Sequence, residues 1–122
     1  MILYIGQFTL GIIYGQWVEW SMHKLLHKIG KKRSSPFSYH FQSHHRSSRE
    51  NLFYDGSYDG QGEGIKKELR DLFLLLVLHL PLILVAPTFL AGAVLQACLY
   101  FFLHRKCHLD PEWCKRYFPW HY

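Results

Sequence analysis

The longest charge-free run in the chain covers residues 72–103. As one straight helix it would be about 48 Å long at roughly 1.5 Å per residue, whereas the hydrocarbon core of a bilayer is only about 30 Å thick. Pro81 and Pro87 interrupt the run, and proline breaks or kinks a helix. We therefore expect a hairpin of two short membrane helices, over about 70–86 and 88–106, with its turn near Pro87.

A second charge-free segment opens the chain at residues 1–18. It does not read as a signal peptide, because no basic residue precedes it, no small-residue cleavage site ends it and a cationic cluster follows it. We expect a retained membrane helix over about 1–22. The fold class is therefore an all-α integral membrane protein with about three transmembrane helices, an N-terminal span plus a hairpin, in one domain over 1–122.

The positive charge of the chain has a simple explanation in this topology. The net charge is +5, and the 14 lysines and arginines all flank apolar segments rather than interrupt them. A hairpin places these cations on one side of the membrane, and cationic loops mark the cytoplasmic side. We therefore expect no nucleic-acid binding. The three cysteines form no CxxC motif, which suits a reducing compartment.

The polar segment between the spans contains the glycine-rich stretch DGSYDGQGEG at 55–64. A calcium-binding loop would require an acidic residue where Lys66 stands, and a dinucleotide-binding loop would require a preceding strand and wider glycine spacing. The stretch is therefore interpreted as a flexible loop.

Histidine is the residue type that points to chemistry. Eight of the nine histidines lie beside the ends of the expected spans, as HxxxH in HKLLH, HxxxHH in HFQSHH, HxxxH in HRKCH and a single histidine in PWHY. Histidines four residues apart share one helix face, about 5–6 Å apart, and imidazole suits iron, zinc and copper. One HxxxH alone is weak evidence. Three clusters that the hairpin brings to one membrane face predict a metal site.

His79 differs from the other histidines, because it lies inside the first arm of the hairpin without a partner at helical spacing. An ionisable group within a membrane needs a partner. We expect His79 to be hydrogen-bonded to a neighbouring helix and leave it out of the metal site.

The order of these motifs resembles the fatty acid hydroxylase and sterol desaturase superfamily of membrane oxygenases. The resemblance runs from EWSMHKLLH through YHFQSHH to LHRKCHLDPEWCKRYFPWHY. Two features depart from the family pattern. The histidine triplet is one residue longer than the common HxxHH, and a closing histidine pair is missing after His121, so the resemblance implies a C-terminally truncated domain.

The resemblance implies a non-haem di-iron centre that uses O2 and two external electrons to hydroxylate or desaturate a lipid, such as a fatty acyl chain or a sterol. A cofactor must carry this chemistry, so two iron ions are expected, together with an electron-donor protein (a cytochrome, or a ferredoxin with its reductase). The metal site would lie on the cytoplasmic face. The implied ligands are His23, His27, His40, His44, His45, His104, His108 and His121. Glu19 and Asp110 lie close enough in sequence to orient histidine N–H groups.

Three alternatives remain open. A haem-binding membrane electron carrier would place its histidine ligands within the spans, where His79 alone lies. A zinc membrane hydrolase would normally carry a catalytic carboxylate inside a histidine motif, and these motifs contain none. The third alternative is a truncated, inactive remnant of the hydroxylase family. Neither the substrate, the choice between hydroxylation and desaturation, the electron donor nor the oligomeric state follows from the sequence.

Overall fold

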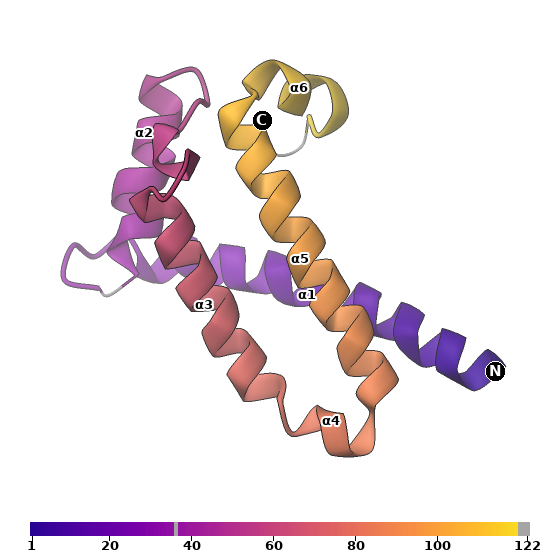
Figure 1. The fold of residues 1–122 in the computed structure, drawn as a ribbon. Coiled ribbons are helices and arrows are strands. Elements are labelled where there is room, and N and C mark those ends of the chain that lie inside the picture. Colours follow the sequence, from indigo (N-terminus) through magenta and orange to yellow (C-terminus); the bar gives the residue numbers. More distant parts are fainter. Residues whose placement is uncertain (36, 120–122) are drawn as a thin grey trace.

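The computed structural model describes residues 1–35 and 37–119, and all the regular structure within them is helical. Three long helices form the frame (Figure 1). These are α1 (Ile2–Ile29), α3 (Glu63–His79) and α5 (Pro87–Leu109). The shorter elements are the π-helix η1 (His40–His44), α2 (His45–Glu50), the 3₁₀-helix η2 (Gly56–Tyr58), α4 (Leu82–Val85) and α6 (Pro111–Tyr117). The all-α expectation is confirmed.

A helical hairpin is present, in which α3 and α5 are joined through the short α4 at one end of the molecule (Figure 1). The expected limits of its first arm, 70–86, are wrong, because α3 begins at Glu63 and ends at His79. Pro81 cannot donate a backbone hydrogen bond, so the helix does not continue through it. Pro87 is not in a turn but is the first residue of α5, a position where its fixed φ and missing N–H are tolerated.

The first helix packs against the second arm of the hairpin through glycine. A Cβ atom on Gly11 would overlap the carbonyl oxygen of Phe89, and a Cβ on Gly92 would overlap that of Phe8. Small residues at such positions allow two helix backbones to approach closely. Beyond this crossing the two helices diverge, α1 toward the side where α2 lies and α5 toward α6 (Figure 1). The C-terminal turns of α1 and α5 are connected through η1, because His40 contacts His23 and His44 contacts His108.

Large apolar side chains are exposed along the opposite part of the molecule. Ile2 is 85% exposed, and Leu84 and Val85 of α4 are 85% and 77% exposed. Among the described residues, α5 is the one helix that is long and apolar enough to cross a bilayer. The small buried core instead gathers around the histidines, with Tyr58, Cys107 and Cys114 as its most enclosed apolar members.

Candidate metal centre

The first pair of histidines comes from the last turns of α1. His23 and His27 are four residues apart, and their Nε2 atoms lie 3.0 Å from each other. The helical period places both rings on one face. They point toward the segment that follows α1, where His40 contributes a ring whose centroid lies 4.9 Å from that of His23.

The second set of histidines is arranged by a π-helical turn. In η1 the backbone N–H of His45 donates to the carbonyl oxygen of His40, the i→i+5 bond of a π-helix. This wider turn aligns residues five apart, and the Nε2 atoms of His40 and His45 lie 3.2 Å from each other. His44, which precedes His45 in the chain, is only 2% exposed and belongs with the histidines of α5. The long HxxxHH spacing is thus accommodated by the π-turn.

The third pair comes from the end of α5. The Nε2 atoms of His104 and His108 lie 3.2 Å apart, and both residues are 5% exposed. The ring of His44 packs against this pair, with centroid distances of 5.5 Å to His104 and 4.4 Å to His108. Tyr58 of η2 stacks on His108 at 5.1 Å, which closes the pair off from solvent.

Seven histidines therefore form two adjacent groups, each with its ring nitrogens within 4.8 Å of one another. The outer group consists of His23, His27, His40 and His45, and all four are partly exposed. The inner group consists of His44, His104 and His108, and all three are buried. The consecutive residues His44 and His45 join the groups, with ring centroids 5.1 Å apart.

Backbone and carboxylate oxygens hold the rings of the inner group. Asp55 Oδ2 accepts from His44 Nδ1 at 2.8 Å, and Glu68 Oε1 accepts from His104 Nδ1 at 2.8 Å. The carbonyl oxygen of Phe53 accepts from His108 Nδ1 at 3.3 Å. Because these oxygens accept hydrogen bonds from Nδ1–H, the Nε2 atom of each ring carries a lone pair that a metal can use.

A buried polar atom supports the fit of a metal ion to these residues. The Nε2 atom of His44 is buried and has no hydrogen-bond partner among the described residues. A buried polar atom left in this way costs free energy of about 1–3 kcal/mol. Since the Nδ1 of the same ring is fixed by Asp55, Nε2 is the atom left to bind a cation. The imidazole donor set suits iron, zinc or copper and not magnesium or calcium.

The electrostatic environment favours the neutral form of His27, His40 and His45, which is the form that binds a metal. Burial, followed by the neighbouring histidines, lowers the pKa of His40 and of His45 to about 2. Burial also lowers the pKa of His27, with Arg49 and Lys31 adding to the effect. For Asp55, burial is outweighed by hydrogen bonds from His44 and Ser57, so the pKa of its carboxyl group falls to about 2. Asp55 is therefore an anion beside the inner group.

The structure brings together seven of the eight histidines expected as ligands, while His121 lies outside the described residues. The two carboxylates expected beside the histidines make other contacts. Glu19 accepts a hydrogen bond from Gln96 at 3.3 Å, and Asp110 accepts from the backbone N–H of Trp113 at the start of α6. The carboxylates at the site are instead Asp55 and Glu68.

Sequence reasoning missed both of these acids. Asp55 opens the glycine-rich stretch interpreted as a flexible loop, yet it is only 3% exposed and also accepts from the backbone N–H of Ser57. The available signal was an aspartate followed by Gly-Ser, typical of a local cap. Glu68 was one acid among several before the charge-free run. Its distinguishing feature, a place on α3 opposite His104, is visible only in three dimensions.

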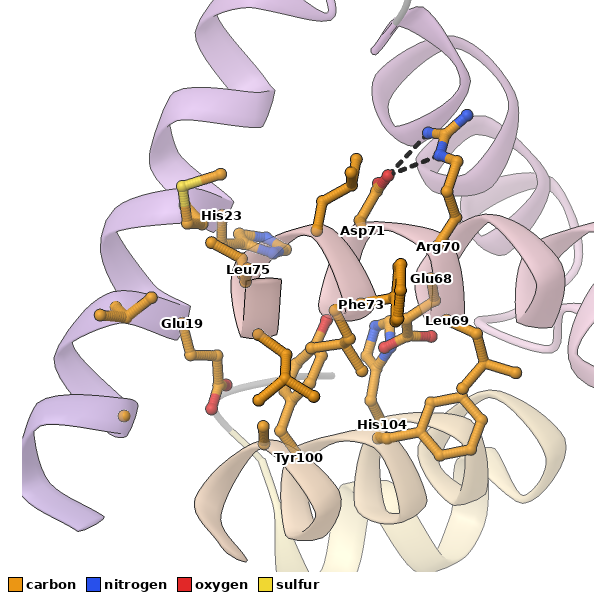
Figure 2. Close-up of a pocket in the computed structure, with 18 of the residues that line it drawn as sticks. Glu19, His23, Glu68, Leu69, Arg70, Asp71, Phe73, Leu75, Tyr100 and His104 are labelled. Atoms are coloured by element: carbon orange, nitrogen blue, oxygen red, sulfur yellow. Dashed lines mark hydrogen bonds and ion pairs between the residues drawn. The ribbon is translucent and has the colours of Figure 1, made fainter. Parts of the chain in front are cut away.

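A cavity of about 920 Å³ lies between α1, α3 and α5 and reaches the histidines. His23, His40, His44 and His104 line one part of it. Most of the remaining wall is apolar and comes from the residues of α3 beyond Leu72 and the facing side of α5. Figure 2 shows Glu19 and His23 on α1, Glu68 on α3 and Tyr100 and His104 on α5 around this space. The volume is in the range of ligand pockets, roughly 300–1,000 Å³.

His79 lies at another part of the cavity wall. Its Nδ1 donates to the carbonyl oxygen of Leu75 at 2.7 Å, so its Nε2 accepts from the Tyr14 hydroxyl at 2.8 Å. The expectation of a hydrogen bond to a neighbouring helix is confirmed. Both ring nitrogens are engaged, which leaves this histidine without a free atom for a haem iron.

In comparisons with protein-family models, with curated proteins and with solved structures, nothing matches this chain.

Proposed function

We propose that this chain is a membrane-embedded di-iron oxygenase that hydroxylates or desaturates a lipid. The observation that carries the proposal is the meeting of two histidine groups at the wall of one apolar cavity. A metal site alone would fit many classes of protein. A metal site that opens into a space shaped for a hydrocarbon fits an enzyme that acts on a C–H bond.

The ligand set supports a two-metal centre. The outer group would hold one ion and the inner group a second, and the adjacent His44 and His45 belong to different groups. Iron is favoured over zinc because the motif order resembles the hydroxylase superfamily and because the cavity is apolar. When bound, the two irons would supply the activation of O2 with two electrons from an electron-donor protein.

The protein's own residues would orient the histidine ligands and bind the lipid. Asp55 and Glu68 hold the rings of His44 and His104, and Tyr58 covers the inner group against water. The apolar side chains of α3 and α5 would bind the lipid chain and direct one of its carbons toward the histidines. Excluding water from such a site strengthens its electrostatic interactions and limits side reactions.

The membrane setting rests on the exposed apolar surface and on the direction of the helices. α5 has the length and composition of a membrane span, and we propose that α1 and α3 accompany it to give three spans. The exposed side chains of Ile2, Leu84 and Val85 would then face lipid. We propose that the histidines face the cytoplasm, because cationic residues flank the expected spans and cationic loops favour the cytoplasmic side.

Metal content and turnover test this proposal together. The chain is purified in detergent from iron-supplemented cells, and iron is measured by elemental mass spectrometry. We expect close to two irons per chain, and O2-dependent oxidation of added lipids when a chemical reductant is supplied. His44→Ala and His104→Ala should each lose iron and abolish product.

The matched control is His79→Ala, which removes a histidine from the same cavity wall and should retain the iron. Full iron retention in both His44→Ala and His104→Ala would contradict the ligand assignment. A metal-loaded protein that oxidises no lipid from a panel of acyl, sphingoid and sterol substrates would contradict the proposed oxygenase activity.

A further inference from the structure

The two histidine groups differ in burial and in the charges that surround them. The inner group is buried and has carboxylates on two of its three rings, Asp55 and Glu68, each 2.8 Å from a ring nitrogen. The outer group is partly exposed, and cations act on it. Lys31 and Arg49 act on His27, and Arg49 also acts on His45. A dication would therefore meet negative charge at one position and positive charge at the other.

We propose that the two metal positions are unequal: the inner group binds the first ion and retains it, and the outer group binds the second ion and exchanges it. This inference rests on the two-metal site proposed above and deepens it. It concerns the order and strength of binding, and it holds or fails whether the bound metal is iron or zinc.

The number of ligands, taken alone, favours the outer group. The outer group offers four imidazoles and the inner group three, and each additional ligand favours binding. However, an acid that holds a ligating histidine typically changes metal affinity by about 10–100-fold. Two such acids, acting independently, contribute roughly 100- to 10,000-fold. The repulsion from Lys31 and Arg49 adds to this difference, and we judge the inner group to be the tighter site.

The arrangement of the rings before a metal binds also favours tighter binding by the inner group. In the inner group the Nε2 atom of His44 is already buried without a hydrogen-bond partner among the described residues, and its ring is held by Asp55. Little reorganisation is needed for a metal to bind there. The outer rings are more accessible to solvent and to a chelator, so an ion bound to them can leave more readily.

Cobalt(II) is a suitable probe, because its visible absorption reports on ligation without any turnover. Metal-free protein in detergent is titrated with cobalt(II) in the presence of a competing chelator. We expect two separate binding steps in the wild-type protein, with affinities at least 10-fold apart. After full loading, a chelator should remove one equivalent quickly and the other slowly.

Variants identify the steps. His23→Ala/His27→Ala should lose the weaker step and keep the tight one. Asp55→Asn and Glu68→Gln retain the size of the side chain, and each should weaken the tight step by about 10–100-fold. Glu63→Gln is the control, since this acid lies on α3 like Glu68 but pairs with the exposed Lys66, and its variant should bind as the wild type does.

Several results would overturn the inference. These are a single step with equal affinities, loss of the tight step in His23→Ala/His27→Ala, or unchanged tight binding in both acid variants. Helical circular dichroism of each metal-free variant separates a lost site from a lost fold. Absence of any cobalt binding would overturn the metal site itself, and with it the proposed function. If the protein binds cobalt in two unequal steps but oxidises no lipid, the inference of unequal metal positions holds and only the proposed oxygenase activity is contradicted.

Discussion

At the scale of single residues, the inner histidines depend on an unusual backbone beside them. Leu52 and Phe53 have φ angles of +51° and +71°, in the left-handed region that side chains other than glycine rarely adopt. This conformation directs the Phe53 carbonyl oxygen to His108, and the next turn brings the backbone N–H of Asp55 to the His108 carbonyl oxygen at 3.0 Å. The strained backbone at Leu52 and Phe53 thus positions the oxygen that holds the ring of His108, a candidate ligand.

Leu52 allows this cost to be measured, because its side chain is 79% exposed and contributes little packing. Leu52→Gly should raise the free energy of unfolding by about 0.5–1 kcal/mol. Glycine adopts a positive φ without steric cost, and this gain exceeds the extra entropy that glycine loses on folding. Thermal unfolding in detergent, followed by circular dichroism, would show a higher midpoint. The control is Leu25→Gly in α1, also exposed at 44%, which should lower the midpoint because glycine weakens a helix by about 1 kcal/mol. A lower midpoint for Leu52→Gly would contradict the strain argument.

At the scale of elements, the crossing of α1 and α5 determines whether the histidines of the two helices meet. Gly11 and Gly92 lie at the contact, where the facing backbone leaves no room for a Cβ atom. His23 and His108 lie beyond this crossing toward the C-terminal ends of their helices. A change of helix separation at the glycines would therefore be transmitted to the distance between the outer and inner groups.

Gly11→Leu should push the helices apart, destabilise the protein by about 1–3 kcal/mol or more, and reduce the bound metal. The natural control is Gly6→Leu on the same helix, where a Cβ atom would meet nothing within 4 Å. We expect that control to bind metal as the wild type does. Equal thermal midpoints and equal metal-to-protein ratios for the two variants would show that the close contact is not required.

At the scale of the whole molecule, the cavity connects the histidines with the apolar part of the structure. It is bounded by α1, α3 and α5, and α4 joins α3 and α5 at the end of the hairpin away from α6 (Figure 1). If lipid reaches the metals through this space, the binding of substrate and the binding of metal should be separable by mutation.

Ala97→Phe places a large ring on the cavity wall and should reduce lipid oxidation at least 10-fold while the metal-to-protein ratio stays unchanged. Leu99→Phe is the control, because Leu99 is 45% exposed and lies on the outside of the same helix. Product analysis and elemental mass spectrometry on the same preparations provide both readouts. Undiminished turnover in Ala97→Phe would place the substrate elsewhere.

Much of the histidine site was predictable because helical geometry is local. Residues four apart share a face in any α-helix, so the pairs His23/His27 and His104/His108 follow from their spacing alone. The apolar runs likewise predicted the long helices, with errors confined to their ends. The limits of α3 were missed because its first turns are polar, and the spacing pattern does not say where a helix leaves the apolar segment.

Residues near one another in the chain were enough to predict that it is helical, partly apolar and rich in histidine at helix ends. Only the tertiary structure decided how the histidines are shared. It assigned the neighbours His44 and His45 to different groups, because the π-turn aligns His45 with His40 while His44 packs against His104 and His108. It also brought Asp55 and Glu68 to His44 and His104, because loop closure and helix crossing join residues up to 36 positions apart.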